Sequence, residues 1–87
     1  MYVLIVYDVS VERGTKIHKK LKQYLHWRQN SVFEGELTEA KIEKLKAELE
    51  RLIVVEEDSI LFYLARDEKW LKRETLGKVL NTTDNLI

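Results

Sequence analysis

YVLIVYDV, residues 2–9, is the stretch of sequence that decides the fold, because so apolar a segment must be buried. It is rich in Val, Ile and Tyr and nearly continuous in apolar character, as is typical of a β-strand covered on both faces. Its one charged residue, Asp8, stands where the strand should emerge from the core. A carboxylate at a strand end, close to cationic side chains, is suited to holding a metal ion against a phosphate.

A basic helix pattern follows this strand over residues 12–27. Ser10 is placed to cap the start of the helix. Four apolar residues recur at spacings of i, i+4, i+7 and i+8, while the lysines fall mostly outside the stripe that they form. The residues of this stripe are Ile17, Leu21, Tyr24 and Leu25. The pattern predicts a helix that packs on the sheet through one face.

The rest of the chain predicts three more strands and one more helix. Residues 29–37 are typical of a second strand, in which Gly35 indicates a bulge or bend. Thr38 is placed to cap a second helix, and residues 59–65 alternate between two apolar faces as a strand does. Residues 74–80 predict a weaker fourth strand, and a turn-like segment follows it.

The order β-α-β-α-β-β predicts an α+β fold, in which both helices cover one face of a mainly antiparallel sheet. The 87 residues make one domain, and a domain of this size buries only about 60–65% of the surface that its unfolded chain exposes. The other sheet face also needs a cover, so we expect a homodimer packed sheet to sheet. We expect residues 74–87 to form a C-terminal strand segment that contacts the partner subunit.

Composition and charge set limits on function. The chain has no Cys and a formal net charge of zero, so it offers no thiolate metal site and its total charge does not mark a nucleic-acid binder. Residues 11–28 hold six Lys or Arg against one acid, whereas acids are in excess over residues 36–58. One basic face is compatible with phosphate contacts, although two solvated helix faces of opposite sign give the same pattern. Neither a signal-peptide nor a membrane-span pattern is visible, so we expect a soluble, cytoplasmic protein with no membrane partner.

The familiar catalytic motifs are absent from the sequence. It has no phosphate-binding glycine loop, no His pair at zinc spacing and no G-x-S-x-G nucleophile motif. A carboxylate–metal site at Asp8 remains, with Mg²⁺ or Mn²⁺, because these ions prefer oxygen ligands and commonly keep several waters. One Asp per subunit can suffice where two copies meet across a dimer axis. The alternative for Asp8 is a helix-entry cap or a surface turn carboxylate.

Side chains near Asp8 suggest how a substrate could be held. Cations of the first helix and just after it could contact a nucleic-acid backbone. These cations are Arg13, Lys16, Lys19, Lys20 and Arg28. Tyr7 and Phe33 could stack on bases, although core packing is the simpler role for each. We assign supporting roles at the same site to Ser10 and Ser31.

Several short motifs occur in a fixed order along the chain. They are Tyr7-Asp8-Val9, Tyr24-Leu25, the block QNSVFEG at residues 29–35, Leu37-Thr38 and Asp58-Ser59-Ile60. In these motifs the chain resembles the small CRISPR-associated endonuclease family, the lesser subunit of the spacer-acquisition complex. The resemblance covers nearly the whole chain, and its most specific part is the Ser-Val-Phe-Glu-Gly block combined with a Tyr-Asp pair on the first strand.

The resemblance implies a ferredoxin-like domain that dimerises through its sheets, with Asp8 as the metal ligand in each of two facing copies. It implies a metal-dependent nuclease acting on single-stranded RNA or double-stranded DNA. A non-catalytic scaffold that holds DNA and bridges dimers of a larger integrase subunit is the alternative, and a toxin-type RNA nuclease is a remote one. The chain departs from the family in having lysines rather than an arginine cluster after Arg13, and Arg28 where an aliphatic residue is common. A ferredoxin-like order also expects two strands between the helices, whereas the pattern predicts a single strand bent at Gly35.

Overall fold

The computed structural model describes residues 1–78 and 80. Over these residues the chain alternates strands and helices in the order β-α-β-β-α-β, followed by one short 3-10 helix. The elements are β1 (Tyr2–Asp8), α1 (Val11–Lys22), β2 (His26–Gln29), β3 (Val32–Glu36), α2 (Glu39–Glu50), β4 (Ser59–Ala65) and η1 (Glu68–Trp70). The prediction of an α+β, ferredoxin-like fold is confirmed.

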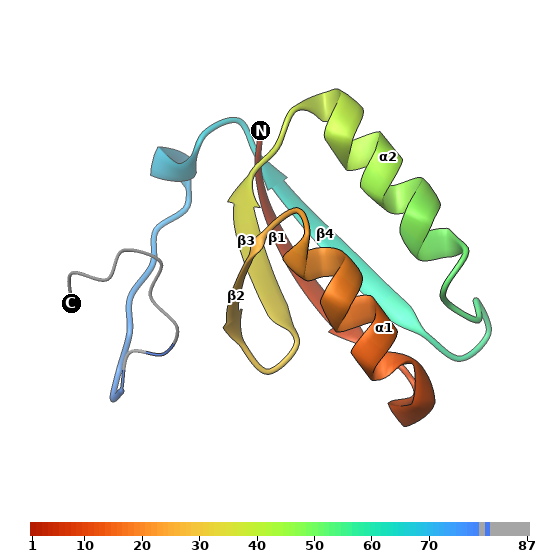
Figure 1. The fold of residues 1–87 in the computed structure, drawn as a ribbon. Coiled ribbons are helices and arrows are strands. Elements are labelled where there is room, and N and C mark those ends of the chain that lie inside the picture. The colour runs from red at the N-terminus through yellow and green to blue at the C-terminus, as the bar shows by residue number, and fades with distance from the viewer. Residues whose placement is uncertain (79, 81–87) are drawn as a thin grey trace.

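Within the described residues the strands form one antiparallel sheet in the order β2-β3-β1-β4. Both helices pack against one face of it (Figure 1). Because side chains alternate along a strand, Val3 and Ile5 of β1 point toward the helices, where both are fully buried. Asp8 is the last residue of β1 and pairs in register with Ser59 of β4.

The core lies between the helices and this face of the sheet. Helix α1 contributes Ile17 and Leu21, and α2 contributes residues at the same helical spacing, all of them buried. Phe33 of β3 is a fully buried member of the cluster. Thr38 caps α2 as predicted, because its hydroxyl oxygen accepts a hydrogen bond from the amide of Lys41 at 3.1 Å.

The segment between the helices differs from the prediction. Helix α1 ends at Lys22, and residues 26–36 form a β-hairpin rather than a helix end followed by one strand. The apolar spacing continued to Leu25 because that residue is buried from the turn after the helix, where its amide bonds to the carbonyl of Leu21. Asn30 has a φ of 42° at the hairpin turn, a conformation that Asn adopts more readily than most residues. The turn at Asn30 divides this segment into the two strands that a ferredoxin-like order requires between the helices.

The bulge lies elsewhere than predicted. Gly35 stays in regular register with Val3, and the irregular pairing falls between Trp27 and Gln29 of β2. A Cβ atom on Gly35 would lie 3.1 Å from Cδ2 of Leu25. A larger residue would require Leu25 to shift by a few tenths of an ångström, so glycine is favoured here by the close approach of the turn after α1, and not by a bend in the strand.

The predicted strand at residues 74–80 is wrong for the single chain. Residues 74–78 and 80 form no strand, and Gly77 has a φ of 84°, far from the extended backbone of a strand. Residues 79 and 81–87, which include the predicted terminal turn, lie outside the described part of the chain. A strand pairing with a partner subunit stays a prediction.

The sheet face opposite the helices carries apolar side chains that remain accessible. Leu61 and Tyr63 of β4 are 49% and 54% exposed on it, and Leu4 and Val6 are only partly buried. A second subunit would cover this face, and that homodimer also stays a prediction. Neither described helix has the length or the apolar composition needed to cross a bilayer.

Candidate functional site

Asp8 is exposed at the end of β1, on the sheet face away from the helices. No hydrogen bond or ion pair joins its side chain to any other described residue. The described residues contain no cluster of three His, Cys, Asp or Glu side chains that could hold a metal ion. A single chain therefore offers one free carboxylate at this point, which fits a hard cation that keeps most of its waters or shares ligands with a second copy.

Behind Asp8, on the helix side of the sheet, lies a small aromatic cluster. The rings of Tyr7 and Phe33 stack with their centroids 6.3 Å apart, and the ring of His18 meets Phe33 edge-on at 5.0 Å. Phe33 is fully buried, so the structure gives it the core role that the sequence left open. Tyr7 is only partly buried, and its phenol oxygen lies 3.5 Å from Nδ1 of His18. Burial raises the pKa of the Tyr7 phenol.

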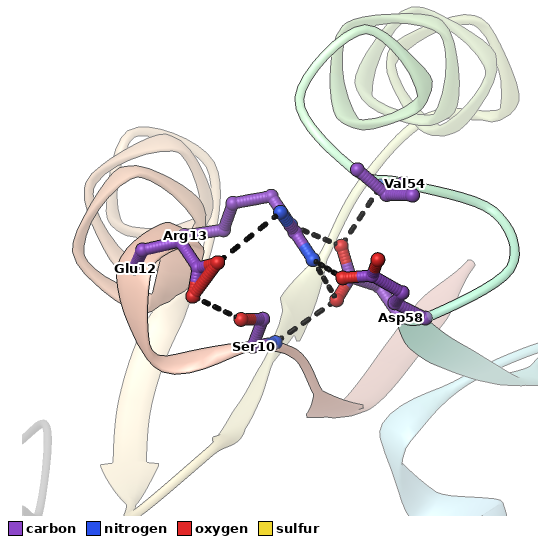
Figure 2. Close-up of polar contacts among 6 residues, drawn as sticks. Ser10, Glu12, Arg13, Val54 and Asp58 are labelled. Carbon is purple, nitrogen blue, oxygen red and sulfur yellow. Dashed lines mark hydrogen bonds and ion pairs between the residues drawn. The ribbon is translucent and has the colours of Figure 1, made fainter.

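Beside Asp8, Arg13 and Asp58 form a partly buried ion pair. Nε of Arg13 donates to Oδ2 of Asp58 at 2.5 Å, and Nη2 donates to Oδ1 at 3.0 Å. The same Asp58 oxygens accept hydrogen bonds from the main-chain amides of Ser10 at 2.9 Å and Val54 at 2.8 Å (Figure 2). Arg13 also donates to Glu57 at 2.8 Å. This network joins the start of α1 to the loop between α2 and β4.

The network changes the acid–base properties of both partners. The hydrogen bonds from Arg13, together with those from the two amides, hold the pKa of Asp58 well below its usual range. The bonds to Asp58 and Glu57 raise the pKa of Arg13 above its ordinary value. Ser10 stands at the N-cap position of α1, but its hydroxyl donates to Glu12 and does not cap the helix. Ser10 contributes to the network through its main-chain amide and not through its hydroxyl.

The cations predicted to bind nucleic acid divide into two groups. Arg13, Lys20 and Arg28 form ion pairs with acids of the same chain, Lys20 with Glu48 at 3.5 Å and Arg28 with Glu34 at 3.0 Å. Lys16 and Lys19 are exposed, and no carboxylate of a described residue lies within ion-pair distance of either. The contacts with nucleic acid stay predictions, but only the second group is available without breaking an ion pair.

Lys22 is a candidate that the sequence prediction missed. It lines a groove of about 590 Å³ along α1, together with Tyr7, Gly14, Thr15, His18 and Lys19. Among the described residues Lys22, like Lys19, has no acid within ion-pair distance. The spacing of the two lysines, i and i+3, places them on neighbouring positions of the helix surface. This i, i+3 spacing is the feature of the sequence from which Lys22 could have been predicted.

Ser31 and Glu34 make hydrogen bonds that hold the β2–β3 hairpin in place. The carbonyl oxygen of Ser31 accepts a hydrogen bond from the amide of Tyr7 at 3.1 Å, so the supporting role of Ser31 is to hold the hairpin tip against β1. Glu34 is a buried carboxylate that the prediction missed. It accepts hydrogen bonds from the hydroxyl of Tyr2 at 2.6 Å, from Arg28 and from Arg73. Burial and the Glu34 hydrogen bond raise the pKa of Tyr2.

A model of a known protein family matches most of this chain. The family model described as "CRISPR associated protein Cas2" matches residues 1–73. The chain belongs to this family. The resemblance found in the sequence motifs is therefore confirmed over most of the chain.

Curated relatives and solved structures agree with the assignment. The chain is 52% identical over 87 residues to a protein of Methanosarcina acetivorans and 47% identical over 87 residues to one of Dictyoglomus turgidum, with all of each chain covered. Both are named CRISPR-associated endoribonuclease Cas2. A crystal structure of Cas2 with 44% identity superposes with a TM-score of 0.87 over 100% of this chain and 98% of the other. The Streptococcus pyogenes Cas2 crystal structure at pH 6.5 gives 37% identity and a TM-score of 0.78 over 88% of this chain and all of the other.

Proposed function

We propose that this chain is a CRISPR-associated, metal-dependent endonuclease of the cytoplasm, in which Asp8 from each of two subunits holds the metal. The observation that carries the proposal is the exposed carboxylate of Asp8, free of any described partner, at the end of a buried strand. The endoribonuclease names of the relatives support the reaction class. Single-stranded RNA and double-stranded DNA are the substrates to test.

The donor chemistry at this position suits Mg²⁺ or Mn²⁺. Asp8 offers carboxylate oxygens, which these hard cations prefer, and no described His or Cys lies in a cluster that would favour a softer metal. When bound, a divalent ion supplies polarisation of a phosphodiester and a more acidic water. The chain contributes the ligand, its fixed position and the cations of α1.

The roles of the other residues follow from their contacts. Lys16, Lys19 and Lys22 hold the phosphate backbone as point charges, because no described acid engages them. Tyr7, protonated and partly exposed, is available to donate a hydrogen bond beside the groove of Lys19 and Lys22. Arg13 is paired with Asp58, so it supports the site by stabilising the fold and not by binding the substrate.

The biological role that we propose is CRISPR adaptation, the integration of new spacer DNA, in partnership with a larger integrase subunit. A non-catalytic form of this role is the second candidate, in which the homodimer only holds DNA and bridges integrase dimers. The specific observation that favours it is that the described part of one chain supplies a single carboxylate and no complete ligand set. The two candidates share the fold and the dimer but differ in what Asp8 does.

Cleavage by wild type, Asp8→Asn and Asp67→Asn separates the two candidates. Asp67 is a matched control, because it is an exposed Asp just after β4, at the opposite end of the sheet from Asp8. If the chain is a nuclease, wild type and Asp67→Asn cleave RNA or duplex DNA with Mg²⁺ or Mn²⁺ and stop when the metal is chelated. Asp8→Asn should then lose at least about 100-fold in rate, since loss of a metal ligand removes several kcal/mol of transition-state stabilisation. Absence of metal-dependent cleavage in all three, with spacer integration unaffected by Asp8→Asn, would establish the scaffold instead.

A further inference from the structure

Asp8 belongs to a closed ring of residues formed partly by the side chain of Asp58. Asp8 pairs in register with Ser59 at the last position of the β1–β4 ladder. Asp58 directly precedes Ser59 and accepts a hydrogen bond from the amide of Ser10 at 2.9 Å. Ser10 lies two residues after Asp8, so the ring runs from Asp8 through Ser10 to Asp58 and returns through Ser59. One side-chain hydrogen bond closes it.

The anchor of this ring is held from two further sides. The side chain of Asp58 has an exposed fraction of 0%, and its oxygens also accept bonds from the amide of Val54 and from Arg13. Figure 2 shows the carboxylate of Asp58 between α1 and the loop that carries Val54, with Ser10 on a third side. All its partners are main-chain amides or a planar guanidinium, which have little freedom to move. The end of β1 is therefore tied to both helical segments through one carboxylate.

Asp8 itself has no such side-chain support. Because its carboxylate makes no hydrogen bond or ion pair with any other described residue, its position depends on the main chain that carries it. The main chain before it is fixed by the sheet, and the main chain after it is fixed by the Ser10–Asp58 bond. We infer that Asp58 is a positioning residue for Asp8, and that it fixes the place and direction in which Asp8 presents its carboxylate to a divalent cation. This inference rests on the proposed function and adds a second aspartate to its machinery.

A positioning role and a merely structural role make different predictions. If Asp58 only joined two segments, its loss would lower stability but leave each folded molecule with normal metal affinity. If it positions Asp8, folded molecules should bind the metal more weakly and react more slowly. Residues that orient metal ligands typically contribute 10–100-fold in affinity or activity, and a misplacement of about 1 Å can cost about 100-fold in rate.

The test compares Asp58→Asn with Glu57→Gln. An Asn side chain has one acceptor oxygen and two N–H donors, so it cannot accept from Ser10, Val54 and Arg13 together. Glu57→Gln is the matched control, because Glu57 shares Arg13 with Asp58 but makes no bond to Ser10. All measurements are made at a temperature where circular dichroism shows every variant to be folded. They are Mn²⁺ titration by water-proton relaxation, steady-state cleavage, and hydrogen exchange at the Ser10 amide.

We expect Asp58→Asn to weaken Mn²⁺ binding at least 10-fold and to lower kcat at least 10-fold, with KM for the nucleic acid unchanged. We expect the Ser10 amide to exchange at least 10-fold faster, while amides within α2 keep their wild-type rates. Glu57→Gln should change none of these values by more than about twofold. Unchanged Mn²⁺ affinity and unchanged Ser10 exchange in Asp58→Asn would overturn the inference, and so would equal changes in both variants.

Failure of the proposed function gives a different result. In that case wild type neither binds Mn²⁺ at Asp8 nor cleaves, and the exchange measurement together with the NMR chemical shift of the Asp8 carboxyl carbon decides the inference. Faster exchange at Ser10 with a shifted Asp8 signal in Asp58→Asn, but not in Glu57→Gln, supports positioning of Asp8. No change in either observable refutes it.

Discussion

Replacing Lys16, Lys19 and Lys22 together by Gln should reduce the salt dependence of nucleic-acid binding by a predictable amount. These three lysines of α1 have no acid of the described residues within ion-pair distance, so each is available to neutralise a phosphate and release a counterion. The slope of log K against log salt changes by about 0.7 for each contact with a single strand. If a strand contacts all three on one copy of α1, the slope should become shallower by about 2.

The assay is fluorescence anisotropy of a labelled single-stranded RNA, titrated with protein at salt concentrations from 50 to 200 mM. The matched control replaces Lys41, Lys44 and Lys46 of α2 by Gln, which changes the net charge equally. Lys46 already lies 3.5 Å from Glu43, and α2 carries several acids. The control should leave the slope within about 0.5 of wild type. Equal loss of slope in the two triple variants would refute the reasoning, because net charge alone would then explain binding.

The ion pairs predict a further contrast among the basic residues. Lys20 is within 3.5 Å of Glu48, so Lys20→Gln should change the slope by less than a single unpaired lysine does. A full change of about 0.7 for Lys20→Gln would mean that this ion pair opens when nucleic acid binds. The comparison of Lys19→Gln with Lys20→Gln, which alter adjacent residues of the same helix, measures this directly.

Three further predictions concern the fold and the dimer. Gly35→Ala should lower the free energy of unfolding by about 1–2 kcal/mol, because a Cβ atom would lie 3.1 Å from Leu25. Urea unfolding measures this loss, and a Leu25→Ala background should remove it. Equal losses in both backgrounds would contradict the prediction. The pKa of Asp58 is lowered by folding, so the stability that it contributes is fully present above about pH 5 and is lost as the pH falls through the folded-state pKa. The stability difference between wild type and Asp58→Asn should therefore be constant from pH 5 to 8 and shrink below about pH 4, whereas a difference independent of pH would be evidence against the ion pair. Tyr63→Lys on the open sheet face should convert a dimer to monomer in sedimentation, while Val55→Lys, at an apolar loop position that is more exposed than Tyr63, should not.

Most of the fold could be predicted from the sequence because its signals are local. The alternation over residues 59–65 correctly separated Phe62 from Leu61 and Tyr63, and the structure places Phe62 on the helix side of the sheet and the other two on the open side. Helix α2 was predicted from its cap at Thr38, a signal that lies at the very start of the helix. The apolar character of residues 2–9 correctly indicated a central strand, and β1 lies between β3 and β4.

The errors came from segments in which a tertiary contact imitates a local pattern. Leu25 has the spacing of a helical residue but is buried from a turn, where it packs on Gly35. The break at Asn30 depends on a positive φ that Asn tolerates but does not require. Residues 74–80 predicted a weaker strand, yet a strand needs a partner edge, and no described strand of this chain pairs with the described residues of this segment.

The candidate site was predictable only in part, for a related reason. Asp8 could be singled out because a charge at the end of an apolar strand is a local feature of the sequence. The availability of the cations could not be predicted, because Glu48 and Asp58 lie more than 25 residues away from Lys20 and Arg13 in sequence. A count of basic residues in the first helix therefore overstates the charge that is available to a phosphate.

Asp8 and Asp58 have the same side chain at the same end of the sheet, and their surroundings give them opposite properties. Asp58 is buried, and burial of a carboxylate is tolerable only when donors surround it, as Arg13 and the amides of Ser10 and Val54 do here. Asp8 is exposed and keeps its oxygens free of described partners. A carboxylate engaged by three neighbours cannot also hold a cation well, and an unsupported one cannot fix its own direction. Placing the two aspartates in one closed ring of residues separates these tasks, so that one carboxylate stays available while the other sets its position.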